Sequence, residues 1–413
     1  MNASLPSPQS LAGVRVLDLS RVLAGPWCTQ TLADLGADVI KIERPGSGDD
    51  TRGWGPPFLR DRAGGETGES AYYLCANRNK RSLAVDIASS AGQAVIRRLA
   101  RDCDVVVENF KVGDMARYGL DADSLRTADP RLIYCSITGY GQTGPYARRP
   151  GYDFAMQGLG GLMSVTGERD GLPGAGPQKV GVAVADLFTG MYATVAILAA
   201  LRHRDATGEG QVIDMALLDA QVAMLANLGS QYLVGGSVPH RMGNGHPSIV
   251  PYQAFETADG HVILAVGNDG QFARFCAIAG HPEWADDPRF TRNADRVRNR
   301  EALVPLIAGV MQGRGRAAWL AALEAAGIPC SPVNGIDEVF ADPQVRARGL
   351  QVDIDHPEQD ALPMVASPLR LSATPVRYRR APPMLGQHTE DVLRESGWSA
   401  QEIDELRAQG VVG

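Results

Sequence analysis

Short apolar runs alternate with helix-like segments along the first third of the chain. The run 14–20 (VRVLDLS) is apolar on both faces, as expected of a strand buried between two layers. Apolar residues then recur at helical spacing at Cys28, Leu32 and Leu35, Gly36 ends the predicted helix, and a strand resumes at 39–43. A strand, a helix and a second strand in so short a stretch predict a parallel βαβ unit with a right-handed crossover.

The alternation of strands and helices continues to residue 233. Residues 138–185 are rich in glycine and are predicted to be mostly loop. This order of elements is typical of a doubly wound α/β sheet. Further strands are predicted at 82–86, 104–108, 132–137 and 211–215, and further helices at 88–100, 114–119, 186–204 and 219–233.

A different pattern begins after the stretch 235–251, whose glycines and prolines are typical of a linker. Two runs, 252–257 and 261–266, flank Ala258-Asp259-Gly260, a turn signal that predicts a hairpin. Helices are predicted at 271–279, 301–326 and 389–409, and the chain between the last two is loop-rich.

Composition and charge narrow the class of protein. With about 100–200 residues per domain, 413 residues predict two or three domains. A hydrophobic share of 44% and a charged share of 21% exclude a disordered or fibrous chain. Lys and Arg number 40 against 47 Asp and Glu, and no long basic run occurs, so a nucleic-acid partner is not expected.

The cysteines, histidines and chain start indicate a soluble protein of a reducing compartment. No CxxC pair occurs and the seven histidines are scattered, so we expect reduced core thiols and no metal site. Residues 1–13 lack the pattern of a secretory signal, and the most apolar stretch, 191–201, is too short to span a bilayer. We therefore expect a cytoplasmic protein without membrane attachment. The six cysteines are Cys28, Cys75, Cys103, Cys135, Cys276 and Cys330.

No widely shared short motif assigns a chemistry. The chain lacks GxGxxG, and its first strand-to-helix turn contains Ala24-Gly25-Pro26 instead, so a nicotinamide or flavin cofactor is not expected. Acidic residues beside glycine-rich loops remain, notably Asp153 and Asp186. Either could cap a helix or act as a carboxylate nucleophile, and the residues alone favour an N-cap at Asp186.

Longer segments are more distinctive. They are RVLAGPWCTQTLADLGADVIKIERPGSGDDTR, NRNKRSLAVD, DVVVENF, and YCSITGYGQTGP followed by GYDFAMQGLGGLMSVTG. In these segments the chain resembles the family III CoA-transferases, which include the formyl-CoA and carnitine CoA-transferases. The resemblance runs from about residue 12 to the C-terminal part, where PPMLGQHTEDVL is also typical. TRGWGPPF, GSQYLVGG and PSIVPYQAF are similar to the succinyl-CoA-dependent dicarboxylate transferases, such as the succinate–hydroxymethylglutarate enzyme.

The resemblance implies a fold and a reaction. It implies a Rossmann-like large α/β domain formed by residues 1–224 and 326–413, a smaller α+β domain at 225–325, and an interlinked homodimer. The segment VAVADLFTG matches the family's nucleophile at Asp186, which would carry an aspartyl-CoA thioester. Gly267 and Gly270 match a glycine loop over the active site, although a simple strand-to-helix turn explains them equally.

The resemblance also implies a CoA site, with CoA thioesters as substrates and no tightly bound cofactor. Arg241, His246, Ser248 and Tyr252 are candidates for holding the distal carboxylate of a dicarboxylate. For Arg44 and Arg117, a solvated end of a strand or helix is the alternative. The implied CoA-binding residues are Leu23, Ala24, Arg44, Val85, Asp86, Ala88, Asn109, Phe110, Lys111, Arg117, Tyr152 and Asp153.

Two alternatives to a transferase stay open. The α-methylacyl-CoA racemases share this fold and place a His before the Asp that Asp153 matches, where this chain has Tyr152. A phenol does not titrate near neutrality as an imidazole does, so racemase chemistry is disfavoured. A CoA-binding paralogue without activity is the second alternative. We expect transfer of CoA from succinyl-CoA to a dicarboxylate, whose identity the sequence does not specify.

Overall fold

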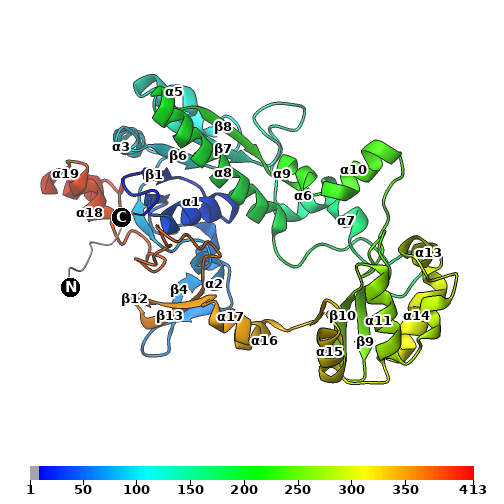
Figure 1. Cartoon of the computed structure of the whole chain (residues 1–413). Helices are drawn as coiled ribbons and strands as arrows, with labels where there is room; N and C mark the ends of the chain where they lie inside the picture. The colour runs from blue at the N-terminus through cyan, green and yellow to red at the C-terminus, as the bar shows by residue number, and fades with distance from the viewer. Residues whose placement is uncertain (1–8) are drawn as a thin grey trace. The chain divides into compact units, whose positions relative to one another are not determined.

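The computed structural model describes residues 9–413, which form two compact units (Figure 1). Unit 1 contains the chain up to Leu162, Val180–Ser230 and Arg346–Gly413, and unit 2 contains Met163–Lys179 and Gln231–Val345. The small unit was expected to begin at residue 225 and to end at residue 325, and both boundaries differ from this expectation. Residues 163–179, expected in the large domain, belong to unit 2. The predicted absence of a signal concerns residues 1–13, of which 1–8 lie outside the described residues.

Long-range contacts explain the two shifts in the boundaries. Glycine-rich residues 163–179 belong to unit 2 because the Gly243 N–H donates to the Gly167 carbonyl at 3.1 Å, and Arg241 donates to the Glu168 carbonyl at 3.3 Å. Residues 326–345 belong to it because the strand Cys330–Pro332 pairs with the hairpin at its centre. Neither contact is visible in the local sequence pattern.

Unit 1 is built on one parallel sheet of six strands. The strands are β1 (Arg15–Asp18), β2 (Asp38–Glu43), β5 (Lys80–Ala84), β6 (Val105–Glu108), β7 (Ile133–Thr138) and β8 (Val212–Ala216). Their order is β5-β2-β1-β6-β7-β8, and every neighbouring pair is parallel. This confirms the predicted α/β class with a parallel sheet. The order reverses between β1 and β6, which is where open α/β sheets bind ligands, at the carboxyl ends of the strands.

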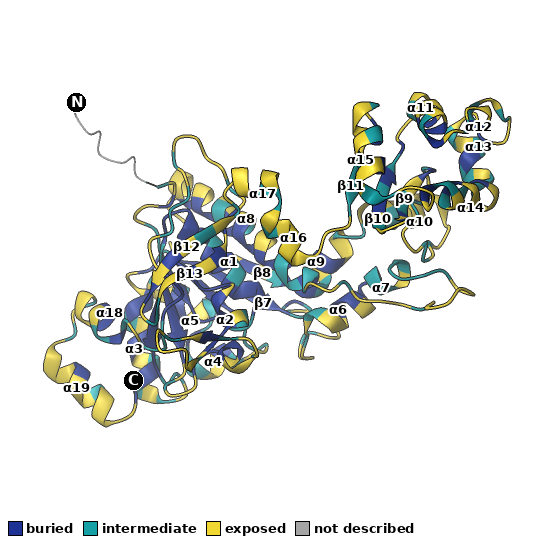
Figure 2. Cartoon of the chain, turned by 90° about the horizontal axis from the view of Figure 1, so that it is seen from below, coloured by how far each residue is buried: buried dark blue, intermediate teal, exposed yellow. Residues whose placement is uncertain are grey.

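Helices cover both faces of this sheet (Figure 2). On one face, Val16 and Val39 pack with Leu32 of α1 and Ile197 of α8. On the other, Leu17 packs among side chains of α3, α18 and α19. The helices of unit 1 are α1 (Ala24–Asp34), α2 (Ala71–Leu74), α3 (Ser90–Ala100), α4 (Asp114–Tyr118), α5 (Ala122–Ala128), α6 (Asp153–Leu159), α8 (Val184–Thr207), α9 (Leu217–Ala223), α18 (Thr389–Glu395) and α19 (Ala400–Ala408), with a 3₁₀ turn at Asp50–Gly53. Helices α7 (Leu162–Val165), α10 (Ala226–Gly235) and α17 (Pro343–Ala347) cross unit boundaries.

Unit 2 contains a three-stranded antiparallel sheet in the order β11-β10-β9. The predicted hairpin is confirmed, since β9 (Tyr252–Thr257) pairs with β10 (Gly260–Ala265), and β11 (Cys330–Pro332) adds the third strand. Phe255, Phe272, Phe275 and Trp319 lie at the centre of its core. Its helices are α11 (Asp269–Ala279), α12 (Glu283–Asp286), α13 (Asn293–Arg298), α14 (Arg300–Met311), α15 (Arg316–Ala325) and α16 (Ile336–Ala341).

Several predicted elements were wrong in extent. The helices expected at 219–233, 301–326 and 389–409 each break into two, the last beside Gly397, which has a φ of 85°. The expected loop 138–185 contains α6 and α7. Two hairpins were not predicted. The strands of the first, β3 (Phe58–Arg60) and β4 (Glu66–Ser70), are short or polar, and the second, β12 (Gln351–His356) with β13 (Gln359–Val365), lies in the stretch expected to be loop-rich.

Candidate active site

A cleft of about 430 Å³ opens at the carboxyl ends of the strands where the sheet order reverses. An adjoining cavity of about 100 Å³ shares Arg21, Arg44 and Phe110 with it and extends over the end of β5. Most of the sequence-predicted site residues meet here. The cleft is lined by Leu23, Ala24, Arg44, Asn109, Phe110, Lys111, Tyr152 and Asp186, and the adjoining cavity by Val85, Asp86 and Ala88.

Asp186 enters the cleft from the first turn of α8. The residue that precedes the helix is Ala183, so Asp186 is not the N-cap that the residues alone favoured. The capping carboxylate comes from Asp153 instead, whose Oδ1 accepts the N–H groups of Ala185 at 2.8 Å and Asp186 at 3.4 Å. The side chain of Asp186 is therefore left available for chemistry.

Helix α8 can approach the β1–α1 turn because of Gly190. A Cβ at this position would lie 2.6 Å from the Ala24 carbonyl oxygen, a clash with backbone that neither helix could relieve by changing a rotamer. Glycine thus permits α1 and α8 to pack closely. This packing brings Leu23 and Ala24 to the same cleft as Asp186.

The electrostatic surroundings of Asp186 are unusual for a carboxylate. Burial, together with the nearby charge of Asp153, raises its pKa to about 7. Among residues 9–413, none donates a hydrogen bond to this carboxylate, and the residue is half-buried. A poorly solvated carboxylate is a stronger nucleophile than one in water, which suits covalent catalysis.

Asp153 and Arg117 line neither cavity. Besides capping α8, Asp153 accepts a hydrogen bond from Gln157 Nε2 at 2.7 Å, so its oxygens hold α6 and α8 in place. The Arg117 side chain is 68% exposed and pairs with Asp114 at 3.0 Å. Asp114 and Tyr118, by contrast, do line the cleft.

Comparison with known proteins decides the family. The model of CoA-transferase family III matches residues 11–389. The chain belongs to this family. It is 53% identical over 93% of its length to the succinate–glutarate CoA-transferase of Agrobacterium fabrum, of which 95% is covered. It is 44% identical over 97% of its length to the human succinyl-CoA:glutarate CoA-transferase, of which 90% is covered.

A solved structure is similar over nearly the whole chain. A CAIB/BAIF family protein from Brucella suis superposes with a TM-score of 0.85 at 47% identity, covering 94% of this chain and 100% of the other. The predicted membership of family III is thereby confirmed, as is the resemblance to succinyl-CoA-dependent dicarboxylate transferases. The protein is therefore a CoA-transferase, an enzyme that uses CoA thioesters as substrates.

In this CoA-transferase, Gly267 and Gly270 lie in unit 2, between β10 and the first turn of α11. The Gly267 N–H donates to Gln271 Oε1 at 2.7 Å, and Asn268 caps α11. Neither glycine has a positive φ, and a Cβ on either would meet its nearest atom, the end of a polar side chain, at 3.4 Å. The turn itself therefore does not require glycine at these two positions.

The four candidates for a distal carboxylate also lie in unit 2. Arg241 pairs with Asp170, and the His246 ring lies 5.3 Å from that of Tyr252, centroid to centroid. The Ser248 N–H donates to His246 Nδ1 at 3.1 Å. Arg241 thus already has a carboxylate partner, although this partner is exposed and could exchange for a ligand.

A buried ionic network beneath the cleft was not predicted. Lys41 pairs with Asp49 at 2.8 Å and Lys80 with Asp18 at 3.1 Å, and all four side chains are fully buried. Burial alone would raise the pKa of Asp49, but the Lys41 ammonium outweighs it and holds the pKa at about 2. Burial lowers the pKa of Lys80 to about 8. A lysine inside a strand gives no signal of burial, because its acidic partner belongs to another element.

Tyr72 is a further residue near Asp186 that the sequence did not indicate. Its ring meets that of Trp54 edge to face at 5.2 Å. Burial, followed by the charges of Asp186 and other neighbours, raises its pKa to about 12. The phenol is therefore neutral at physiological pH and can donate a hydrogen bond.

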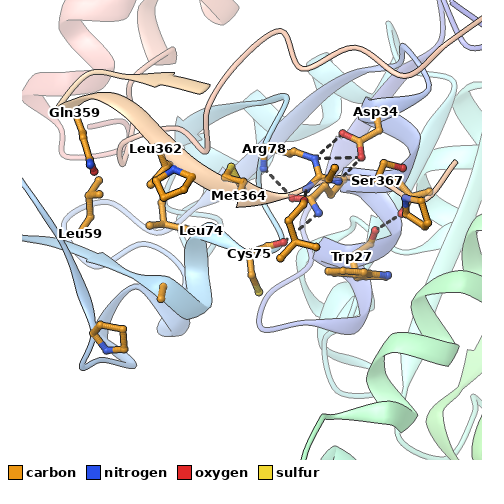
Figure 3. A pocket seen from close by; sticks show the side chains of 18 of the residues that line it. Trp27, Asp34, Leu59, Leu74, Cys75, Arg78, Gln359, Leu362, Met364 and Ser367 are labelled. Carbon is orange, nitrogen blue, oxygen red and sulfur yellow. Dashed lines mark hydrogen bonds and ion pairs between the residues drawn. The ribbon is translucent and has the colours of Figure 1, made fainter. Parts of the chain in front are cut away.

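A further cavity, of about 600 Å³, is not the predicted site (Figure 3). It shares no lining residue with the cleft, and its wall is mostly apolar, with Trp27, Leu74 and Met364 among its side chains. The Arg78–Asp34 ion pair, at 2.5 Å, lies along one side of it. None of the predicted catalytic or CoA-binding residues lies there.

Metal-ligating side chains do not cluster in the described part of the chain. Within residues 9–413, no group of three or more His, Cys, Asp or Glu side chains could hold a metal ion. Helix α8, with 24 residues, has the length and hydropathy to cross a membrane, which alone is weak evidence for a span, so the expected absence of membrane attachment stays a prediction. One side of α8 packs against α1, β7 and β8 in the core of unit 1.

Proposed function

We propose that this enzyme transfers CoA from succinyl-CoA to a dicarboxylate such as glutarate, through an aspartyl-CoA thioester on Asp186. The observation that carries the proposal is the position of Asp186 in the cleft. Its carboxylate is half-buried, and sequence-predicted neighbours of a CoA substrate line the same cleft and the cavity that adjoins it. The names of relatives that are 53% and 44% identical supply the two acids.

The first half-reaction loads the enzyme. The Asp186 carboxylate attacks the thioester carbonyl of succinyl-CoA, the C–S bond breaks, and a mixed anhydride and CoA thiolate form. The thiolate then attacks the aspartyl carbonyl of the anhydride, which releases succinate and leaves CoA on Asp186. No proton is gained or lost, so the reaction needs no general base, only an ionised Asp186.

The second half-reaction is the reverse with a new acid. A carboxylate of the acceptor attacks the aspartyl-CoA thioester and releases the thiolate, which then attacks the acceptor side of the anhydride. The product is the acceptor's CoA thioester, and the Asp186 carboxylate is restored. Splitting one exchange into acyl transfers between groups of similar reactivity lowers each barrier.

The cleft has the charges needed to hold the phosphates of CoA. Arg21, Arg44, Lys111 and Arg149 all line it. Arginine matches phosphate oxygens with a planar fork of donors, and lysine supplies a point charge. The carboxyl ends of the parallel strands and the start of α1 add backbone N–H groups.

A homodimer is part of the proposal. One stripe of α8 exposes Phe188, Met191, Tyr192 and Val195, with Val195 59% exposed. Four large apolar side chains at a spacing of three and four residues form a continuous patch, which isolated soluble chains rarely leave in water. A second copy in the family's interlinked arrangement would cover this stripe. We further propose a cytoplasmic location.

Replacement of the nucleophile tests the reaction. Asp186→Asn should lower succinyl-CoA:glutarate exchange by roughly 10⁴-fold, because an amide cannot form the anhydride. Borohydride added with succinyl-CoA should trap the wild-type thioester and leave the variant unmodified. Asp219→Asn, an exposed change on α9, is the matched control.

The alternatives predict different results. If Asp186→Asn retains exchange, the nucleophile is misassigned. Deuterium wash-in at the α-carbon of a 2-methylacyl-CoA without exchange of CoA would instead identify a racemase. CoA binding without either reaction would identify a paralogue that lacks activity.

A further inference from the structure

Val22 adopts a backbone conformation that valine rarely tolerates. Its φ is 70°, and among residues 9–413 the only other non-glycine residues with positive φ are Asn79 and Ala226. A β-branched side chain in this region clashes with its own backbone, so the surroundings must enforce the conformation. Val22 lies directly before Leu23 and Ala24, which line the cleft together with Asp186.

The carboxamide of Asn109 holds the residue next to Val22. Its Oδ1 accepts the Arg21 N–H at 2.9 Å, and its Nδ2 donates to the Arg21 carbonyl at 2.7 Å. The two bonds close a ring like that between paired strands, across the reversal of sheet order between β1 and β6. One N–H of the carboxamide and one acceptor position of its oxygen are thus engaged on this turn, which fixes the plane of the side chain.

A second contact holds Val22 itself. The carboxylate of Asp49 accepts the Val22 N–H, with 3.3 Å to each oxygen. Asp49 is fixed by the buried Lys41, whose ammonium also donates to the Ser20 carbonyl at 3.0 Å. The three consecutive residues Ser20, Arg21 and Val22 are therefore held from β2, from the loop after β2 and from the loop after β6.

The turn so held leads into two residues of the cleft wall, Leu23 and Ala24, whose N–H groups have no protein acceptor in the described part of the chain. Among residues 9–413, none accepts a hydrogen bond from the backbone N–H of Leu23 or Ala24, and the first N–H of α1 with a partner is that of Trp27. A helix start leaves such groups free for an anionic ligand. Their direction depends on the φ of Val22, since this residue sets the path of the chain into α1.

We propose that Asn109 is a positioning residue for CoA: it keeps the Arg21–Val22 turn in its strained conformation and thereby aims Leu23 and Ala24 at the bound substrate. This inference rests on the proposed function. It gives the side chain of Asn109, which is expected to be a CoA-binding residue, a role through the Arg21–Val22 turn. The strain at Val22 makes the role testable, because glycine adopts a positive φ without strain.

A double-mutant cycle tests the coupling between the two residues. The dissociation constant of CoA and the KM for succinyl-CoA are measured for wild type, Asn109→Ala, Val22→Gly and the double variant. With Val22 in place, Asn109→Ala should weaken CoA binding about tenfold, since two hydrogen bonds to the turn are lost. In the Val22→Gly background the same change should weaken it about threefold or less, because the turn no longer needs enforcement.

If Asn109→Ala weakens CoA binding by the same factor with Val22 and with Val22→Gly, the positioning role is overturned. It is also overturned if Asn109→Ala leaves the affinity for CoA unchanged. If the Asn109 side chain contacted CoA directly, its loss would weaken CoA binding by the same factor in both backgrounds. The cycle therefore distinguishes direct binding from positioning. Asn299→Ala is the matched control, because the Asn299 amide also donates to two backbone carbonyls, at 2.9 and 3.1 Å, but within unit 2. It should leave the affinity for CoA unchanged.

Two further readouts separate the possible failures. If Asn109→Ala does not fold, as seen by circular dichroism, the cycle is run with Asn109→Ser, which should show the same dependence on residue 22 with smaller factors. Wild-type protein that binds CoA but exchanges none would overturn the proposed function, and the positioning role would still be decided by the CoA affinities. If the wild-type enzyme exchanges CoA but the two substitutions affect CoA affinity independently of each other, only the positioning role is overturned.

Discussion

At the level of single residues, the proposed role of Asp186 as nucleophile requires an ionised carboxylate, although the residue is half-buried. Burial strengthens it as a nucleophile but raises its pKa to about 7, so a large fraction is protonated and inactive just below neutrality. Asp153 contributes to this shift while capping α8 with the same carboxylate. The group that caps α8 therefore disfavours the ionised form of the proposed nucleophile.

This conflict predicts a pH dependence. Because the deprotonated form attacks, kcat/KM should fall as the pH drops through about 7, and Asp153→Asn should move this acidic limb to lower pH by removing the neighbouring charge. The asparagine keeps an oxygen for the Ala185 N–H, so α8 should remain capped. Exchange rates at low substrate concentration from about pH 5 to 9 measure the limb.

Asp219→Asn serves as the control for that experiment and should leave the limb in place. A limb that stays near 7 in Asp153→Asn would show that burial alone sets the pKa of Asp186. A limb absent from wild type would show that the free enzyme carries an ionised Asp186 over the whole range.

At the level of elements, a substitution in the turn between β10 and α11 tests whether this turn is the expected glycine loop of the active site. Gly267→Ala should change the free energy of unfolding by less than about 1 kcal/mol, because φ is not positive and a Cβ would meet its nearest atom at 3.4 Å. If the loop serves catalysis, kcat for exchange should nevertheless fall about tenfold or more. Urea unfolding and steady-state kinetics give the two quantities.

The outcome for Gly267→Ala discriminates between the two explanations of this segment. A variant with normal kcat supports a plain strand-to-helix turn. A variant with lost stability would contradict the open geometry around this glycine. Ala277→Gly, an exposed change on α11 away from the turn, is a control for glycine effects on that helix.

The strands of the large sheet are also joined by buried charges. Lys80→Met should destabilise the enzyme by about 3 kcal/mol or more, because it leaves the Asp18 carboxylate buried without its ammonium partner. The exposed pair Arg62–Asp360 provides the comparison, and Arg62→Met should cost less than about 1 kcal/mol. Chemical denaturation of both variants at one pH measures the difference.

A small effect of Lys80→Met would mean that the hydrogen bonds from Ser20 and Thr29 suffice to hold the Asp18 anion. In that case the network would matter for the shape of the cleft floor and not for stability. The CoA affinity of the variant would then show whether the turn above it has moved.

For the molecule as a whole, the α8 stripe predicts self-association. The protein in solution should have twice the chain mass of 44.0 kDa, and Tyr192→Asp should shift it toward the monomer, because a charge in a buried apolar interface is costly. Light scattering coupled to size exclusion measures the mass. Leu306→Asp, at an apolar residue of α14 that is 43% exposed, is the matched control.

A monomeric wild type would contradict the homodimer and leave the exposed stripe unexplained. A dimer unaffected by Tyr192→Asp would place the interface elsewhere. The proposed exchange reaction can be measured on the same samples, which relates activity to the state of assembly.

The class of fold and the chemistry could be predicted from the linear order of residues. Alternation of apolar strands and amphipathic helices is a local property, because each element is specified by which of its own faces must leave water. The long motifs around Asp186, Leu23–Ala24 and Asn109 then indicated the proposed nucleophile and many of the residues that line the cleft. These positions lie in turns whose composition is itself distinctive.

Which distant residues meet became clear only in the folded chain. The Asp153 carboxylate caps α8, Lys41 and Lys80 are buried among acids, and β11 and residues 163–179 join unit 2. Asp153 and Ala185 are 32 residues apart, and Lys80 and Asp18 are 62 apart. A charged side chain looks exposed in the local pattern, because the partner that compensates its burial comes from another part of the chain.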